Sequence, residues 1–182
     1  MGFRFLSCGR PLSYLGRALA LSLMLGASPG LTQELQSEFV MEVVIEAGDP
    51  QTIGDVPLGA RAIYPVTGGS FEGPEIKGKI IDGADWLIVR RDGVYELDVR
   101  VTLETVGGEL IYMNYVGFIS AAPDIMAGLL AGGDVSPDQY YMRTTPRFET
   151  SAQTYAWMNS AVFVGVGQMS DGAVSYRIYA IE

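Results

Sequence analysis

The sequence predicts an all-β protein, an antiparallel barrel of about ten short strands with one short helix. Apolar and polar residues alternate with a period of two through most of the chain, most cleanly over residues 95–104. Segments rich in glycine, proline and aspartate recur between these runs, as expected of turns. No internal repeat, heptad or strand–helix alternation appears. We favour a barrel over a sandwich, because closure removes edge strands and small barrels readily enclose one ligand.

The pattern of alternation and turns assigns each element in order. Strands are expected over residues 38–46, 58–64, 76–81, 86–90, 95–104, 109–119, 140–149, 160–168 and 173–181. Residues 47–57 are expected to form a loop, and residues 70–72 lie between two glycine-containing turns at 68–69 and 73–74. Further interruptions are expected at Pro65, at the turn 82–85 and at Pro146.

One helix is expected over residues 122–131. Pro123 suits a first helical turn, Asp124 complements the helix dipole, and Gly132-Gly133 ends the segment. Such a short helix would close one end of the barrel.

The first 30 residues resemble a secretory signal peptide. Three arginines precede a short apolar core at residues 18–27, which is about half of the roughly 20 residues that a membrane-spanning helix needs. We therefore expect residues 1–30 to be removed, residues 31–37 to form a disordered linker, and residues 38–182 to form a single β-barrel domain. This organisation places the mature protein in the periplasm or outside the cell, with no membrane contact after the signal is removed.

The composition excludes several kinds of chemistry. The one cysteine, Cys8, lies in the predicted signal peptide, and the chain has no histidine. Disulfides, thiol nucleophiles and the usual zinc sites are therefore not expected, and catalysis would have to use carboxylates, tyrosines, arginines or lysines. No phosphate-binding loop, dinucleotide fingerprint, nucleophile elbow or calcium loop is present, so we expect neither a cofactor nor a metal.

The charge of the chain argues against partners that are themselves strongly negative. The formal net charge is −9, and it becomes about −12 without residues 1–30, because three arginines and no acidic residue lie there. A surface of this sign repels nucleic acid and anionic membranes, so neither is expected as a partner. The aromatic residues and arginines described below are the reason to expect a small apolar or aromatic molecule as the partner. The sequence is also compatible with a homo-oligomer.

Residues 143–159 hold an unusual concentration of polar and aromatic side chains. Arg143 or Arg147, if it faced a cavity, could bind a carboxylate or phenolate through paired hydrogen bonds. Alternatively, these arginines pair with Glu149 and stabilise the rim of the barrel. Asn159 could bind a ligand or cap the turn that follows it.

Aromatic residues from distant strands form a second candidate group. Tyrosine and tryptophan suit pockets for flat ligands, although core packing would explain each of them individually. The candidate ligand-binding residues are Trp86, Tyr112, Tyr115, Tyr155 and Trp157, together with Arg143, Arg147 and Asn159, and Tyr140 and Tyr141 complete the aromatic set.

Two carboxylates and a tyrosine are the candidate catalytic residues. Glu72 and Asp85 each lie beside an aromatic residue, and burial against it would raise the carboxyl pKa toward that of a general base. Tyr112 is the third candidate. Alternatively, the two carboxylates accept backbone N–H groups and only stabilise turns.

Four segments resemble one known family. They are GGSFEGP at 68–74, GADW at 83–86, YMRTTPRFE at 141–149 and YAWMN at 155–159. Their order and spacing are similar to those of the domain of unknown function numbered 3237, also called uncharacterised protein family 0311, over roughly residues 38–181. The resemblance implies a calycin-like antiparallel β-barrel and no settled activity. The predicted signal peptide departs from most members, which lack one.

Three functions remain open from the sequence. The first is a periplasmic or secreted barrel that binds a small apolar or aromatic molecule. The second is a cofactor-independent lyase or isomerase acting on an aromatic metabolite, in which a tyrosine or a carboxylate moves protons and Arg143 or Arg147 stabilises an oxyanion. The third is a structural or interaction module, in which the same residues only stabilise the fold.

Overall fold

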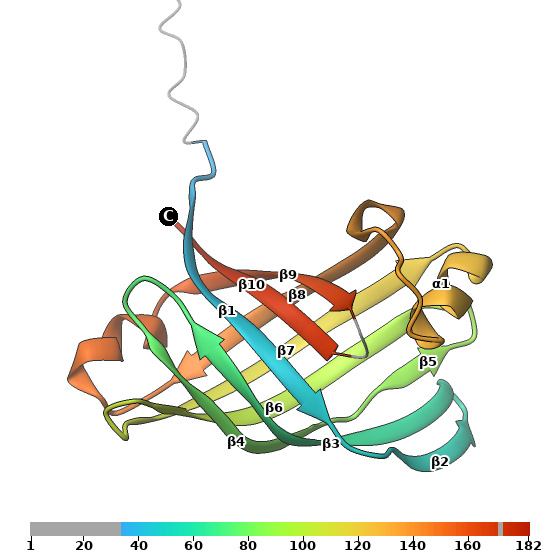
Figure 1. The fold of residues 1–182 in the computed structure, drawn as a ribbon, viewed down its shortest axis with the longest axis horizontal. Helices are drawn as coiled ribbons and strands as arrows, with labels where there is room; N and C mark the ends of the chain where they lie inside the picture. Colours follow the sequence, from blue (N-terminus) through green and yellow to red (C-terminus); the bar gives the residue numbers. More distant parts are fainter. Residues whose placement is uncertain (1–33, 171–172) are drawn as a thin grey trace, which may run out of the picture. The chain divides into compact units, whose positions relative to one another are not determined.

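Ten strands form the framework of the part of the chain that the structure describes (Figure 1). The computed structural model describes residues 34–170 and 173–182. The strands are β1 (Ser37–Ala47), β2 (Gln51–Val56), β3 (Gly59–Glu72), β4 (Lys77–Asp85), β5 (Ile88–Arg90), β6 (Tyr95–Thr105), β7 (Leu110–Ala121), β8 (Tyr140–Glu149), β9 (Val162–Ser170) and β10 (Ala173–Ile181). The helices are α1 (Pro123–Leu130) and two 3-10 helices, η1 (Pro137–Gln139) and η2 (Gln153–Asn159). The predicted signal peptide and residues 31–33 of the predicted linker lie outside the described residues.

Eight of the strands close into an antiparallel barrel. Their order is β1-β10-β9-β8-β7-β6-β4-β3, and pairing of β3 with β1 completes the circle. β2 pairs with the first part of β3, and β5 bridges β3 and β6. The prediction of an all-β antiparallel barrel with one short helix is therefore confirmed.

Several strands are longer than predicted, because glycine and proline do not interrupt them. β3 runs through Pro65 and Gly69, and β4 runs through the segment predicted as a turn at 82–85. At Gly69 and Gly83 a neighbouring backbone carbonyl would lie 2.1 and 2.2 Å from a Cβ atom, so glycine permits close strand approach there. The predicted interruptions at Pro65, 68–69 and 82–85 were wrong.

Two further predictions are corrected. β8 continues through Pro146, whose register partner is Tyr115 on β7, whereas the ladder of β8 with β9 contains only Arg143↔Val166 and Thr144↔Gly165. The missing N–H of Pro146 therefore falls beyond the part of β8 that pairs with β9. Residues 51–56, predicted as loop, form β2 because they fold back on the start of β3.

The barrel has two different ends (Figure 1). Strand β7 leads into α1 at one end, here called the α1 end, and α1 buries Met126 and Leu129 there. Strand β8 leads to η2 at the other end, here called the η2 end, where η2 buries Met158. None of the helices in residues 34–170 and 173–182 is long and apolar enough to span a membrane.

The interior changes character along the barrel. Toward the η2 end it is filled by large apolar side chains that are essentially inaccessible, among them Phe71, Leu103, Ile111, Phe148 and Phe163. Phe148 and Phe163 pack edge to face with ring centroids 4.8 Å apart. This half is a packed core of the kind that contributes most of the hydrophobic stabilisation of a barrel.

Candidate functional site

Asp85 lies at the end of β4 and faces the barrel interior. Its register partners are Tyr64 on β3 and Val99 on β6, and Val99 is in turn opposite Tyr115 on β7. Directly opposed residues share one face of a sheet, and Val99 and Tyr115 are both buried in the core. Asp85 and Tyr64 therefore lie on the inner face too, near the α1 end.

The carboxyl group of Asp85 has little compensation for its burial. It accepts one hydrogen bond, from the backbone N–H of Asp98 at 3.1 Å, and makes no ion pair within the described residues. Arg61 is close enough to favour its charge, but the guanidinium donates its hydrogen bond to the carbonyl of Trp86. Burial dominates over these contacts and raises the pKa of Asp85 to about 6.

Two buried tyrosines lie beside Asp85. The rings of Tyr115 and Tyr176 are 5.2 Å apart and tilted by 59°. Burial is the main cause that raises the pKa of both hydroxyl groups, and the nearby Asp85 raises each further. Both tyrosines therefore stay neutral at physiological pH and keep a proton that can be donated in a hydrogen bond.

Thr144 adds a third hydroxyl group to the same inner face. It is 2% exposed, and its Oγ1 has no hydrogen-bond partner among the described residues. Its register partner on β9 is Gly165, where a Cβ atom would lie 2.2 Å from that oxygen. Glycine on β9 therefore leaves the room that the Thr144 side chain occupies. A buried hydroxyl without a partner is uncommon, and it often marks a position where a bound water or ligand supplies the hydrogen bond.

Part of the inner face at the α1 end is exposed to solvent, whereas Tyr115, Thr144 and Tyr176 lie buried behind it. Four residues of this region alternate in step with the core residues of their strands and so face inward, yet each is partly exposed: Tyr64, Asp85, Met169 and Val174. Tyr95, at the start of β6, lies near Tyr64, and burial raises its pKa. We call Tyr64, Asp85, Tyr115, Thr144 and Tyr176 the Asp85 cluster.

The Asp85 cluster combines the groups needed for proton transfer. A carboxyl group with a pKa near 6 is mostly ionised at neutral pH and still basic enough to accept a proton. Neutral tyrosine hydroxyl groups in a water-poor interior stabilise negative charge that develops on a substrate oxygen.

The other predicted site residues do not converge on this cluster. Trp86 and Tyr112 lie on the outside of the barrel, where they line a shallow groove of ≈ 380 Å³ with Asp82 and Arg100. The Arg100 guanidinium lies 4.9 Å from the centroid of the Trp86 ring. This stacking covers one face of the tryptophan that a flat ligand would otherwise use.

Arg143 and Arg147 also point outward. Each is followed on β8 by a residue buried on the inner face, Thr144 and Phe148 respectively, and successive side chains of a strand point to opposite faces. The guanidinium of Arg143 stacks on Tyr141 at 5.3 Å and donates a hydrogen bond to the carbonyl of Met142 at 2.9 Å. Neither arginine forms an ion pair with Glu149 in the part of the chain that the structure describes. They are therefore placed neither as a clamp inside the barrel nor as the predicted rim pair.

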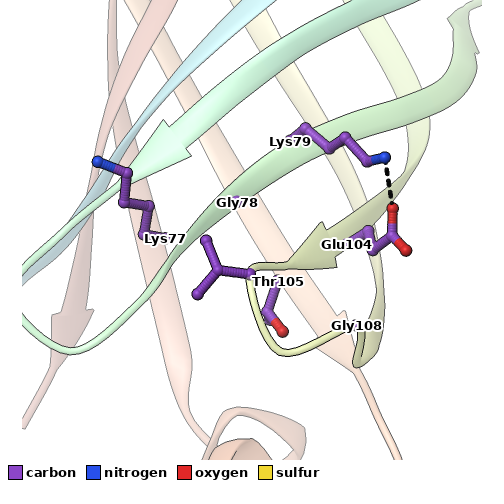
Figure 2. A pocket seen from close by; sticks show the side chains of 7 residues that line it. Lys77, Gly78, Lys79, Glu104, Thr105 and Gly108 are labelled. Carbon is purple, nitrogen blue, oxygen red and sulfur yellow. Dashed lines mark ion pairs between the residues drawn. The ribbon is translucent and has the colours of Figure 1, made fainter.

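Glu72 is exposed at the end of β3, where it pairs with Lys77 at 3.1 Å. Figure 2 shows the neighbouring depression of ≈ 370 Å³, in which Lys79 reaches Glu104 at 2.8 Å while Lys77 points away from it. Both lysines are paired with carboxylates in solvent, and such pairs contribute little energy. This depression offers no unpaired group for a substrate.

The last three predicted residues belong to η2. Tyr155 and Trp157 line a groove of ≈ 260 Å³ at the η2 end of the barrel. Asn159 accepts a hydrogen bond from the backbone N–H of Thr150 at 2.8 Å and donates one to the carbonyl of Thr150 at 2.9 Å. Its structural role is thus to tie the last residue of η2 to the residue that directly follows β8.

The sequence prediction missed Tyr64, Thr144, Tyr176 and Arg61. Tyr176 alternates in phase with Ile178 and Ala180, and this alternation alone would have placed it on the inner face of β10. Tyr64 was assigned to a strand end because Pro65 follows it. In residues 34–170 and 173–182, no group of three or more acidic, histidine or cysteine side chains could hold a metal ion.

Comparison with known proteins identifies the family. The model of the family "Protein of unknown function (DUF3237)" matches residues 35–181. The chain belongs to this family. A DUF3237 relative from Clostridium acetobutylicum, named as a UPF0311 protein, is 32% identical over 152 residues, which cover 82% of this chain and 96% of the relative.

Two solved structures superpose on this barrel. A conserved protein of unknown function from Rhodopseudomonas palustris superposes with a TM-score of 0.78 at 30% identity, covering 83% of this chain and 100% of the other. A β-barrel like protein from Acinetobacter baumannii superposes with a TM-score of 0.72 at 36% identity, covering 82% and 97%. The resemblance in the four sequence segments is therefore confirmed.

Proposed function

We propose that this DUF3237 protein binds a small aromatic molecule at the α1 end of its barrel and catalyses a cofactor-independent proton transfer on it. The observation that carries the proposal is Asp85, a carboxyl group with a pKa of about 6 on the inner face beside neutral tyrosines. A buried carboxyl without an ion pair destabilises a fold, and perturbed groups of this kind concentrate at functional sites.

The reaction class follows from the groups present. The Asp85 carboxylate removes a proton from a carbon next to a substrate carbonyl, and the electron pair moves onto the carbonyl oxygen. The hydroxyl groups of Tyr115 and Tyr176 donate hydrogen bonds to the enolate oxygen. Return of the proton to the same carbon gives exchange, and return to another carbon gives an isomer, so no oxidant or cofactor is needed.

The substrate class follows from the lining. Tyrosine rings offer flat apolar surface with a polar edge, which suits an aromatic ring that carries an oxygen. The free Oγ1 of Thr144 could hydrogen-bond to a further polar atom of the ligand.

Deuterium exchange into 2-tetralone, an aromatic ketone with acidic C–H bonds, tests the proposal. In D₂O the wild-type protein should accelerate exchange, and the rate should rise with pH through about 6, because the carboxylate is the base. Asp85→Asn should lose this acceleration, whereas Asp82→Asn, an exposed neighbour with the same change in charge, should keep it. Equal exchange rates for the wild type and Asp85→Asn would refute the catalytic role.

Binding without turnover is the second candidate function, favoured by the partner-free hydroxyl of Thr144. Native mass spectrometry of protein purified under mild conditions tests it. A retained molecule that is recovered unchanged, and whose retention Thr144→Val weakens, would identify a carrier.

The proposal includes a location in the periplasm or outside the cell, which rests on the signal-like sequence of residues 1–30. Intact mass measurement of protein expressed with its own N-terminus tests this part. A mature mass that lacks about 30 residues supports it, and a full-length mass in the cytoplasmic fraction contradicts it.

A further inference from the structure

A second candidate site lies at the η2 end, separate from the Asp85 cluster. The groove of ≈ 260 Å³ runs between η2, the first residues of β1 and the β3–β4 hairpin. Strand β4 separates that hairpin from Asp85, a distance of about 25 Å along an extended chain. The two sites can therefore be tested independently.

The base of this groove is apolar, and its walls are aromatic. Val40, Ile76 and Met158 are buried beneath it. Trp157 packs on Phe163 at 5.7 Å between ring centroids, which fixes its orientation, yet 46% of its surface stays exposed. A large aromatic side chain held in place but left open is a ready contact surface for a ligand.

Two carboxylates complete the lining of the groove. Glu38 and Glu75 are exposed at its margin, and no lysine or arginine is among the residues that line it. Neither glutamate forms an ion pair within the described residues. The groove therefore combines negative charge with aromatic surface, which is the combination that attracts organic cations.

We propose that this groove binds a small organic ammonium ion. The rings of Tyr155 and Trp157 contact the alkyl groups around the nitrogen, and the carboxylates of Glu38 and Glu75 lie beside its charge. Tryptophan is the strongest aromatic partner of a cation, and alkylated ammonium groups are weakly hydrated enough to leave water for it. This site goes beyond the proposed proton transfer and does not depend on it.

Fluorescence titration with choline tests the proposal. The chain has two tryptophans, so Trp86→Phe leaves Trp157 as the only reporter. Choline should change the Trp157 emission in a saturable way, and 3,3-dimethylbutanol, its neutral analogue of the same shape, should bind about tenfold more weakly. Equal affinity for the two compounds, or no saturable binding of choline by the folded protein, would overturn the proposal.

Variants locate the binding. Glu38→Gln with Glu75→Gln should weaken choline binding about tenfold and leave 3,3-dimethylbutanol unaffected. Glu46→Gln with Asp49→Asn, which also removes two negative charges but near the other end of β1, is the matched control and should bind choline normally. Asp85→Asn should bind it normally too, so a failure of the catalytic proposal would leave this result intact. An equal loss in the Glu46→Gln, Asp49→Asn control would show only a general effect of net charge and refute the site.

Discussion

Asp85 couples the chemistry of the proposed site to the stability of the fold. Its folded-state pKa of about 6 lies above the value of about 3.9 that an unfolded chain gives. The stabilisation linked to its proton is therefore complete below about pH 4 and is lost as the pH rises through about 6. At neutral pH the ionised Asp85 therefore lowers the stability of the fold, as expected where function requires a buried charge.

Asp85→Asn should therefore stabilise the protein in a pH-dependent manner. The asparagine can still accept the hydrogen bond from Asp98, but it carries no charge to bury. After allowance for partial exposure, the gain in free energy of unfolding should grow from near zero at pH 4 to about 1–2 kcal/mol at pH 8. Urea denaturation across this range measures it. Asp82→Asn is the exposed control, and a gain that does not change with pH would contradict the assigned pKa.

Removing the hydroxyl group should have opposite effects on stability at the two buried threonines, Thr105 and Thr144. The Thr105 hydroxyl donates to the carboxylate of Glu109 and accepts from the N–H groups of Gly107 and Glu109, both at 3.2 Å. Thr144 has no such partner in the described chain. Valine has nearly the same shape as threonine, so each substitution isolates the hydroxyl group.

Thr105→Val should cost about 1–3 kcal/mol of unfolding free energy, because it leaves buried or half-buried polar groups unpaired. Thr144→Val should be neutral or stabilising, because it removes a hydroxyl group whose burial costs free energy and which forms no hydrogen bond to offset that cost. Thermal or urea unfolding of both variants measures the difference. A destabilised Thr144→Val would mean that its hydroxyl group is already satisfied in solution.

At the scale of elements, η2 contains Asn159, which the sequence suggested as a ligand-binding residue and which instead stabilises the local backbone. Asn159 closes the connection between β8 and η2 through both backbone groups of Thr150. Asn159→Ala should cost about 1–2 kcal/mol, since both bonds are lost. Asn114→Ala on the outer face of β7, whose side chain makes no hydrogen bond among the described residues, should change stability by no more than about 0.5 kcal/mol. Equal effects in the two variants would show that the Thr150 contact carries no stability.

The strand boundaries were predictable where apolar and polar residues alternate regularly, and not where several glycines lie close together. Alternation over 95–104 assigned β6 correctly, and the buried residues of this strand, Leu97, Val99, Val101 and Leu103, follow it. At Gly69 and Gly83 the sequence cannot distinguish a turn from a close approach of strands, because both require the absence of a Cβ atom. The long, bent β3 and β4 were therefore divided into short pieces.

The site was predictable only in part for a related reason. Asp85 was a candidate because an aromatic residue follows it, but its partners come from four other strands. Tyr64, Tyr115, Thr144 and Tyr176 share the inner face with Asp85 only through the register of the closed barrel, which local sequence does not specify. The enriched segment 143–159 instead contributes to the outer face and to the η2 end.

On the scale of the whole molecule, the closed barrel has one weakly paired seam. β6 and β7 pair without interruption from Tyr95↔Ile119 to Glu104↔Leu110, whereas β8 and β9 pair only at Arg143↔Val166 and Thr144↔Gly165. Toward the α1 end, the Tyr140 hydroxyl accepts a hydrogen bond from the Met169 N–H at 2.9 Å and so joins the two strands. Side chains therefore replace part of the backbone ladder at this seam.

Local opening should accordingly begin between β8 and β9. Hydrogen exchange measured residue by residue should be faster for amides along this seam than for those between β6 and β7, because fewer backbone bonds must break. Tyr140→Phe removes the acceptor of the Met169 amide, so that amide should exchange about tenfold faster, with a loss of about 1 kcal/mol in stability. Tyr141→Phe is the matched control, since this neighbouring side chain points outward and is 52% exposed. If both variants exchange alike, or if the seam is as protected as β6–β7, the barrel opens elsewhere and Tyr140 does not secure its closure.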